Sequence, residues 1–354
     1  MTRSVMVTGG AGFIGVNFVY HWAERHADDR LVVLDALTYA GNRASLAPLE
    51  AAGRITFVHG DICDAALIGR IMAEHGIDTI VHFAAESHVD RSITGPGAFI
   101  RTNLEGTHTL LAAAREAWLS GAGREHRFHH VSTDEVYGSL GPNDPPFTES
   151  TRYEPNSPYS ASKAGSDHLV RAYEHTYGLQ ATTSNCSNNY GPFHFPEKLI
   201  PLCLTRILDG RKLPVYGDGS NIRDWLYVTD HARGIATILE SGAPGETYNI
   251  GGGNEWANLD IVKLLCREMD ARFAAEAQLA SRFPDAPQAR GASAETLIEF
   301  VQDRAGHDWR YAIDAAKIER ELGFRPQETF ETGLAKTIDW YLDNESWWRP
   351  LSAA

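Results

Sequence analysis

The sequence lacks the features of several large classes of protein. Its four cysteines, Cys63, Cys186, Cys203 and Cys266, are scattered and form no C-x-x-C pair, so neither a zinc site nor a disulfide framework is indicated. Free thiols fit a reducing cytosol. No apolar run reaches the roughly 18 residues of a membrane helix, and MTRSVMVTGG at the start leaves no room for a signal peptide. We therefore expect a cytoplasmic protein that binds no metal.

Basic residues are also scarce. The 354 residues include 32 Lys and Arg against 46 Asp and Glu, which gives a net charge of -14. This charge argues against non-specific nucleic-acid binding, which needs a basic face. An anionic ligand would need a local cluster of Arg and Lys. The length allows a large core and about two domains.

Short apolar strands alternate with amphipathic helices in the first half of the chain. The pattern predicts strands at 4–9, 30–37, 54–62, 78–86, 127–136 and 180–191, and helices at 13–26, 100–118 and 157–178. Apolar strands separated by helices are typical of a parallel sheet covered on both faces, so we predict the α/β class with a doubly wound (Rossmann) sheet.

Proline and glycine become frequent after about residue 190. We expect residues 1–190, with a return segment near 225–252, to form a cofactor-binding domain. Residues 191–224 and 253–354 would form a smaller C-terminal region that binds substrate. Residues 270–296 have the weakest pattern, and we expect an irregular surface segment there. Trp347 and Trp348 are interpreted as packing residues.

A glycine motif lies between the first predicted strand and helix. Gly9, Gly12 and Gly15 permit a tight turn, close approach to a pyrophosphate and close helix packing. Asp35 ends the next predicted strand, where a carboxylate accepts from the ribose hydroxyls of NAD and repels the 2'-phosphate of NADP. The motif and its setting predict NAD as cofactor. Asp61 would lie at the adenine end, or would alternatively cap the helix that follows it.

Two further patterns carry chemistry. Tyr159 and Lys163 are four residues apart and share one face of a helix. An ammonium group, like a cationic nicotinamide, favours the phenolate and lowers the pKa of the tyrosine, which could then take a proton from a sugar hydroxyl while hydride leaves the same carbon. The segment VSTDEVYG places Asp134 and Glu135 at a strand end, where acids are disfavoured. Each pattern alone could be an ordinary solvated surface.

Together these residues resemble a known superfamily. The motif Gly9-x-x-Gly12-x-x-Gly15, Thr133 and Tyr159-x-x-x-Lys163 resemble the extended short-chain dehydrogenase/reductases. Most epimerases of that superfamily carry small hydroxyl residues where this chain has Asp134 and Glu135. The segments STDEVYG, FAAESHVDRS, NNYGPFHFPEKLIP, NIRDWLYVTDH and DRAGHDWRYAID resemble the dTDP-glucose 4,6-dehydratase family, from about residue 4 to TIDWYLDNESWW near the end.

The resemblance implies a lyase of deoxysugar biosynthesis. The NAD-dependent reaction would convert dTDP-glucose to dTDP-4-keto-6-deoxyglucose by transient oxidation at C4, elimination of water across C5 and C6, and hydride return to C6. The C4 ketone makes the C5 proton removable, so a base for C5 and an acid for O6 are needed. By position, Asp134 would be the acid and Glu135 the base. Thr133 would hydrogen-bond the 4-hydroxyl, Tyr159 would deprotonate it, and Lys163 would hold the nicotinamide ribose.

The resemblance also implies two sets of binding residues and a homodimer formed through two helices, at 103–118 and 160–178. The NAD set comprises Gly9, Gly12, Phe13, Ile14, Gly15, Asp35, Thr38, Asp61, Ile62, Ala84, Ala85, Thr102, Tyr159, Lys163 and Asn189. The sugar-nucleotide set comprises Ser87, Thr133, Asn188, Lys198, Leu199, Pro214, Tyr216, Arg223, Asn258, Arg304 and His307. Of these, Lys198, Arg223, Arg304 and His307 are expected to surround the diphosphate. Trp309 departs from the family pattern, which favours a polar or basic residue there.

Two alternatives stay open. The first is a 4,6-dehydratase or 4-epimerase of a UDP- or CDP-sugar; thymine and uracil differ by one methyl group, worth only about 1–3 kcal/mol in an apolar pocket. An epimerase has no use for the Asp134–Glu135 pair. The second alternative is a non-catalytic NAD-binding scaffold, which would not need Tyr159 and Lys163.

Overall fold

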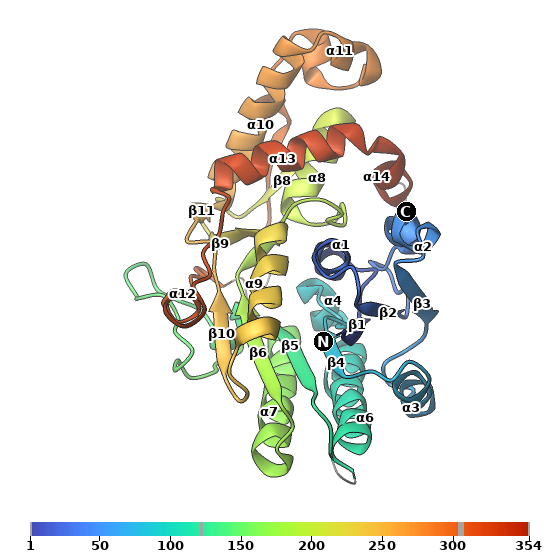
Figure 1. Ribbon diagram of the computed structural model, residues 1–354. Coiled ribbons are helices and arrows are strands. Elements are labelled where there is room, and N and C mark those ends of the chain that lie inside the picture. The colour runs from blue at the N-terminus through green and yellow to red at the C-terminus, as the bar shows by residue number, and fades with distance from the viewer. Residues whose placement is uncertain (1, 121–122, 304–307, 353–354) are drawn as a thin grey trace.

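The computed structural model describes residues 2–120, 123–303 and 308–352 (Figure 1). Its centre is a seven-stranded sheet in the order β10-β6-β5-β4-β1-β2-β3, with every neighbouring pair parallel. This arrangement confirms the predicted doubly wound α/β class. The strands are β1 (Ser4–Thr8), β2 (Arg30–Asp35), β3 (Ile55–His59), β4 (Thr79–His82), β5 (Arg127–Thr133), β6 (Ala181–Cys186) and β10 (Thr247–Ile250).

Helices cover both faces of this sheet because the central strands are apolar on both sides. Val5 and Val7 of β1 pack in one core beneath α1 (Phe13–Arg25) and α9 (Val228–Ser241). Met6 packs in a second core, beneath α3 (Ala65–Glu74), α6 (Thr107–Leu119) and α7 (Pro158–Tyr177). Adjacent strand residues point to opposite faces, so burial of all three apolar side chains requires a layer of helices on each side.

A smaller lobe lies beyond one edge of the sheet, at the top of Figure 1. It has its own apolar core, a three-stranded sheet in the order β11-β9-β7 and a two-stranded sheet of β12 and β8. Its strands are β7 (Asn188–Tyr190), β8 (Leu213–Tyr216), β9 (Ile222–Tyr227), β11 (Glu255–Ala257) and β12 (Ile298–Val301). Its main helices are α8 (Leu199–Leu208), α10 (Asn258–Ala275), α11 (Gln278–Arg282), α13 (Phe330–Asp343) and α14 (Glu345–Ser352).

The remaining elements are short. They are η1 (Arg43–Leu46), α2 (Ala47–Ala51), α4 (Val89–Thr94), α5 (Pro96–Phe99), η2 (Ile100–Gly106), η3 (Asp134–Tyr137), η4 (Pro287–Arg290), η5 (Ala294–Leu297) and α12 (Ala316–Leu322). None of the helices in the described part of the chain combines the length and the apolar content that a membrane span requires.

Local chemistry explains why the most distinct predicted helix forms. The side chain of Ser157 accepts a hydrogen bond from the backbone N–H of Ser160 and forms a capping box at the start of α7. Pro158 occupies the first helical position, where its missing N–H costs nothing. Gly178 ends the helix in the left-handed conformation at φ 75°. The predicted helix at 157–178 is therefore confirmed to within a residue at each end.

Two sequence predictions need correction, and one gains detail. The segment 180–191 is two strands, because the chain leaves the main sheet at Ser187 and β7 pairs with β9. The predicted helix at 100–118 is confirmed, although it begins as a π-helix, η2, before α6 continues it. Residues 270–296 are largely helical, and Leu279, Phe283 and Ala286 are buried there. Polar residues between these buried positions interrupt the apolar periodicity by which a helix is predicted from the sequence.

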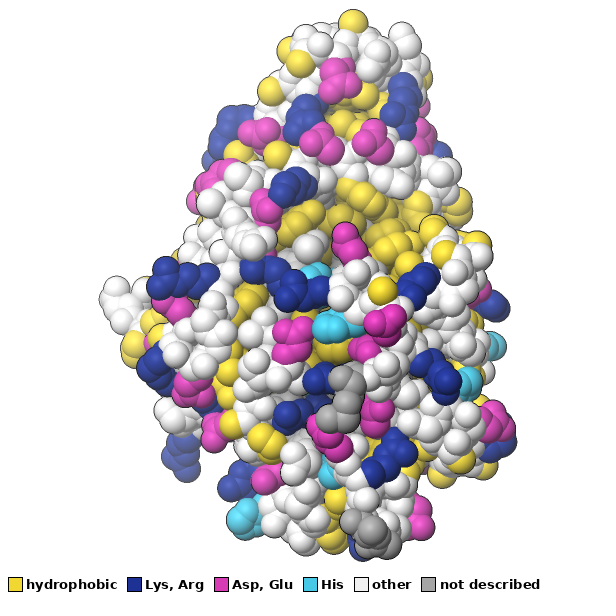
Figure 2. Space-filling view, in the orientation of Figure 1, with side chains coloured by type: hydrophobic (Ala, Val, Ile, Leu, Met, Phe, Trp, Pro, Cys, Tyr) yellow, Lys and Arg dark blue, Asp and Glu magenta, His cyan; other side chains and the backbone are white. Residues whose placement is uncertain are grey.

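Aromatic residues join the smaller lobe to the first. The ring of Phe193 lies 4.8 Å from that of Trp340 and 5.7 Å from that of Trp347, and the Trp347 indole donates to the Ser45 hydroxyl at 2.8 Å. Trp348 is fully buried. Trp347 and Trp348 are thus packing residues, as predicted. Figure 2 shows hydrophobic surface between α13 and α1, with acidic and basic side chains interspersed elsewhere on this face.

Candidate functional site

The glycine loop between β1 and α1 fits a pyrophosphate. Gly9 has φ 69°, and a Cβ there would lie 2.6 Å from the backbone nitrogen of Ala84. A Cβ on Gly15 would lie 2.2 Å from the carbonyl oxygen of Gly9. The first turn of α1 has neither an acidic side chain nor a side-chain cap. Its amide groups and the positive end of the helix dipole therefore suit an anion.

Asp35 lies at the carboxyl end of β2, beside this loop. The carboxylate is buried and accepts from the backbone N–H of Ala11 at 2.9 Å and of Leu37 at 2.8 Å. Burial raises the pKa of Asp35, while these two hydrogen bonds act in the opposite direction. The side chain is thus held at the strand end, next to Thr38 in the following loop. The position suits a ribose, and the negative charge disfavours a 2'-phosphate.

The other predicted NAD residues come from several elements around the same end of the sheet. Asp61 and Ile62 follow β3, Ala84 and Ala85 follow β4, and Thr102 lies in η2. The alternative reading of Asp61 as a helix cap is wrong, because Asp64 caps α3. Asp61 instead pairs with Arg101 at 3.1 Å. Asn189, in β7, accepts through Oδ1 from His231 Nδ1 at 3.0 Å and donates through Nδ2 to the Ser187 carbonyl at 2.9 Å.

Replacement of Gly15 by alanine tests the loop. We expect Gly15→Ala to release NAD and to destabilise the protein by about 1–3 kcal/mol, as overpacking of a tight site does, because the new methyl group would meet the Gly9 carbonyl at 2.2 Å. Calorimetry and the NAD content of the purified protein would measure this. Gly69→Ala is a matched control in α3, where an added Cβ meets nothing within 4 Å. That variant should be slightly more stable; equal behaviour of the two would contradict the prediction.

The predicted acid and base lie where β5 ends. Thr133 is the last residue of the strand, and Asp134 and Glu135 begin the short helix η3. The Thr133 hydroxyl accepts from the backbone N–H of Glu135 at 3.3 Å and donates to Asp134 Oδ1 at 3.4 Å. Asp134 is 2% exposed. Burial, and then the charges of Glu135 and Asp224, raise its pKa well above the usual range, which favours the protonated form of Asp134 and suits it to donate a proton.

Tyr159 and Lys163 face this strand end from α7, and both are buried. The Lys163 ammonium donates to the Val131 carbonyl at 2.9 Å. The expected lowering of the tyrosine pKa is not what the structure gives: burial and then the charge of Glu135 raise the pKa of Tyr159, and the nearby Thr133 hydroxyl only partly opposes this. Burial also lowers the pKa of Lys163. Desolvation is thus the largest influence on the pKa of each group.

The predicted substrate residues come from elements of both lobes. Ser87 follows β4, Asn188 begins β7, Lys198 precedes α8, which begins at Leu199, and Asn258 begins α10. Pro214 and Tyr216 lie on β8, where the Tyr216 side chain is exposed. Arg223 lies on β9 and donates to the carbonyls of Ile222 at 2.7 Å and Asp308 at 3.0 Å. Arg304 and His307 lie outside the described residues. The Trp309 side chain is largely exposed.

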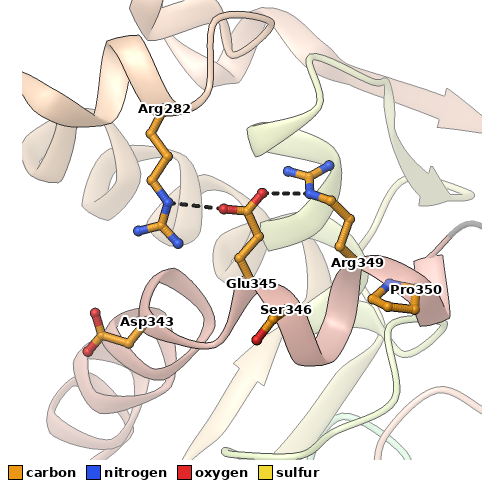
Figure 3. Close-up of a pocket in the computed structure, with 6 residues that line it drawn as sticks. All are labelled: Arg282, Asp343, Glu345, Ser346, Arg349 and Pro350. Carbon is orange, nitrogen blue, oxygen red and sulfur yellow. Dashed lines mark hydrogen bonds and ion pairs between the residues drawn. The ribbon is translucent and has the colours of Figure 1, made fainter.

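A separate hollow of about 750 Å³ lies at the far side of the smaller lobe (Figure 3). Glu345 sits at its centre between two arginines, 3.0 Å from Arg282 and 2.6 Å from Arg349. Arg349 also pairs with Asp209 at 3.0 Å. The charges are matched within the chain and brace α11 against α14, so this hollow is structural and none of the predicted site residues lines it.

Sequence reasoning missed buried acids behind the site. Asp167 lies on α7, where His130 and Ser132 of β5 contact its two carboxylate oxygens at 3.0 and 2.8 Å. Asp224, next to Arg223, accepts from the backbone N–H of Asn254 at 2.6 Å. A signal for Asp167 was present, since 159, 163 and 167 repeat every four residues and so share one helix face.

Comparison with known proteins agrees with this geometry. The chain belongs to the sugar-nucleotide 4,6-dehydratase family, because the family model described as GDP-mannose 4,6 dehydratase matches residues 6–337. It is 54% identical to a dTDP-glucose 4,6-dehydratase of Escherichia coli, over 98% of this chain and 95% of that protein. A counterpart in Neisseria meningitidis serogroup B is 55% identical, with the same coverage.

Solved structures extend the comparison. The dTDP-glucose 4,6-dehydratase DesIV of Streptomyces venezuelae, with NAD bound, has a TM-score of 0.87 and 49% identity over 99% of this chain and 100% of that one. A UDP-glucose 4-epimerase of Thermotoga maritima has a TM-score of 0.82 at 25% identity, over 97% of this chain and 100% of that one. The fold is thus common to both activities, and the site residues must distinguish them.

Proposed function

We propose that the protein is an NAD-dependent hydro-lyase that dehydrates dTDP-glucose to dTDP-4-keto-6-deoxyglucose. The observation that carries the proposal is the meeting of two groups at one strand end. Asp134 and Glu135, which an elimination needs, lie after β5, and Tyr159 and Lys163, which an alcohol oxidation needs, face them from α7. Sequence identity of 54% to a dTDP-glucose 4,6-dehydratase supports it.

The residues present fit NAD. The loop of Gly9, Gly12 and Gly15 and the first turn of α1 would hold the pyrophosphate, and Asp35 would hold the adenosine ribose. Lys163 would hold the nicotinamide ribose. When bound, NAD would supply a hydride acceptor for C4 of the sugar and a hydride donor for C6, and its positive charge would favour the phenolate of Tyr159.

In the oxidation step, Tyr159 takes the proton of the 4-hydroxyl while Thr133 hydrogen-bonds the same oxygen. Burial and the charge of Glu135 oppose the phenolate, so a nearby cation is required. The chain supplies one in Lys163, one helical turn away. General base catalysis of this kind contributes roughly 10²- to 10⁴-fold in rate.

In the elimination step, the two acids act differently because their surroundings differ. Asp134 is buried and its pKa is raised by burial, Glu135 and Asp224, so it is the proton donor to O6. Glu135 is only partly buried and acts as the base at C5. Once C4 is a ketone, the C5 proton is acidic enough for a carboxylate to remove it. A pair of acids in different protonation states is a common solution to such chemistry.

The sugar nucleotide would bind between the lobes. We propose that residues 1–190 and the segment near 225–252 bind NAD and that the remaining parts bind the sugar nucleotide. Arg223 and Lys198 would contact the diphosphate, since arginine binds phosphate oxygens in a bidentate manner. Arg223 is buried and held by backbone carbonyls, so its orientation is fixed before the ligand arrives.

The other functions are less well supported. An epimerase needs Tyr159 and Lys163 but not the buried acid Asp134. A non-catalytic scaffold needs none of the three. A dehydratase of UDP- or CDP-sugars uses the same residues and differs only in the pocket for the base.

Incubation with sugar nucleotides tests the proposal. The purified protein, with no NAD added, would be given dTDP-glucose and, separately, UDP-glucose. Mass spectrometry should show loss of one water from dTDP-glucose and little from UDP-glucose. Loss of water from UDP-glucose alone would support the dehydration reaction but would identify UDP-glucose as the substrate. No loss from either, even after NAD is added, would refute the dehydratase.

We further propose a cytoplasmic homodimer formed through η2–α6 and α7. Ile100 and Tyr177, near the ends of these helices, are 55% and 42% exposed, which supports an apolar contact there. Light scattering should give twice the 39.0 kDa mass of the chain. A monomer at micromolar concentration would contradict this prediction.

A further inference from the structure

The proposed reaction gives no role to Asp167, a buried carboxylate of α7. Asp167 lies four residues beyond Lys163 and eight beyond Tyr159 on α7, and it is 5% exposed. Side chains at this spacing share one helix face. A buried charge is costly unless it is paired and hydrogen-bonded, so its position directly behind the catalytic pair requires an explanation.

Three consecutive residues of β5 bind this face of α7. His130 Nε2 lies 3.0 Å from Asp167 Oδ1, and the Ser132 hydroxyl donates to Oδ2 at 2.8 Å. Between them, the Val131 carbonyl accepts from Lys163 Nζ at 2.9 Å. We call this arrangement of Asp167, His130 and Ser132 the Asp167 clamp. The next residue of the strand is Thr133, so the clamp joins the helix that carries Tyr159 to the strand end that carries the acids.

The charges around the clamp indicate that Asp167 stabilises the charged form of Lys163. Burial lowers the pKa of Lys163, and the charge of Asp167 is the largest effect that opposes it. Burial raises the pKa of Asp167 to about 6, against the influence of Lys163 and Ser132, so it is an anion at neutral pH. Burial, and then Lys163, hold the pKa of His130 well below its usual range. His130 is therefore neutral and donates from Nε2.

Other titratable groups around the pair do not supply this negative charge. They are Tyr159 and His168 on α7, Tyr153, Tyr137 of η3, Cys186 of β6 and His82 of β4. Burial raises the pKa of the Cys186 thiol and of the Tyr153 phenol, so both are neutral. Burial also keeps His82 uncharged. The negative charge that stabilises the Lys163 ammonium therefore comes from Asp167 and not from these other groups.

We propose that Asp167 is a positioning residue for the oxidation step: it keeps Lys163 charged and fixes α7 against β5, so that Tyr159 meets the substrate as a phenolate. The role rests on the proposed function. Asp167 does not touch the reacting atoms and acts through Lys163.

Asp167→Asn removes the charge while it keeps the volume. The amide oxygen can still accept from His130, and the amide NH2 would face the Ser132 hydroxyl, which can turn to accept. We expect the rate of C4 oxidation to fall about 10- to 100-fold with little change in KM. The isotope effect with substrate deuterated at C4 should rise, because oxidation becomes limiting. The alkaline limb of the pH–rate profile should move down by about one unit. A variant with the wild-type rate and profile would overturn the proposal.

Ser132→Ala is the matched control, since it removes one hydrogen bond from the clamp but leaves the charge of Asp167. Because the lost hydrogen bond lowers the pKa of Asp167 in the wild type, the pH profile should move in the same direction as that of Asp167→Asn but by much less. If both variants lose activity and thermal stability alike, with both profiles unchanged, Asp167 has only a structural role and the proposal fails.

A second measurement does not depend on turnover. NMR of labelled lysine side chains, with Lys163 assigned from a Lys163→Met spectrum, should show a lower pKa for Lys163 in Asp167→Asn than in the wild type. An unchanged value would overturn the proposal. Wild-type protein that dehydrates neither sugar nucleotide would refute the proposed function instead, while this titration would still test whether Asp167 keeps Lys163 charged.

Discussion

Glu135→Gln should stop product formation while oxidation at C4 continues. Glutamine fills the same space but cannot accept the C5 proton, so the rate of dehydration should fall by roughly 10²- to 10⁴-fold. Tyr159, Lys163 and Thr133 are unchanged, so hydride should still leave C4. Substrate added to the variant should therefore produce the absorbance of bound NADH, which persists because elimination does not follow.

The control for this variant is Glu154→Gln, which changes an exposed glutamate close in sequence. It should retain wild-type turnover and show no lasting NADH signal. Full activity of Glu135→Gln would show that Glu135 is not the base and that another residue removes the C5 proton. Loss of both product and NADH would show that Glu135 serves oxidation rather than elimination.

Tyr159→Phe should block the reaction one step earlier. Without the phenol oxygen the proposed base for the 4-hydroxyl proton is missing, so we expect turnover to fall by roughly 10²- to 10⁴-fold. In contrast to Glu135→Gln, no NADH should accumulate after substrate is added. Absorbance and mass spectrometry on the same sample would measure both quantities.

Tyr173→Phe is the control. Tyr173 lies on the same helix, away from the strand end, and its ring packs against His108 and Tyr177. The substitution should leave turnover unchanged and so separates loss of the phenol from disturbance of α7. Accumulation of NADH in Tyr159→Phe would mean that another group takes the 4-hydroxyl proton. The two predictions together place Tyr159 before Glu135 in the reaction.

Much of the fold was predictable because its signals are local. The apolar strands, the glycines at 9, 12 and 15, and the cap and stop residues of α7 each depend on neighbours in sequence. The segment 180–191 was not resolved into two strands, because both halves have strand character and only pairing with β10 or with β9 separates them. The helices at 270–296 were missed because their burial depends on α10 and on distant parts of the smaller lobe.

The candidate site was predictable to a similar extent. Asp134, Glu135, Tyr159 and Lys163 could be identified because their types and spacing suggest acid–base chemistry and because the chain resembles a known family. The direction of the Tyr159 pKa was wrong, because spacing along a helix shows which groups are near but not how deeply they are buried. Desolvation depends on the whole packed structure.

The sequence by itself determined the class of sheet, the dinucleotide loop and the chemical groups available, because each depends on residue type and local periodicity. The tertiary structure alone decided which carboxylate has its pKa raised by burial and which side chains lie beside Lys163. Asp134 owes its raised pKa to burial and to Glu135 and Asp224, and Asp224 is distant in sequence. His130 and Ser132 reach Asp167 across 37 and 35 residues. Burial and long-range contacts exist only once the strands and helices have packed together.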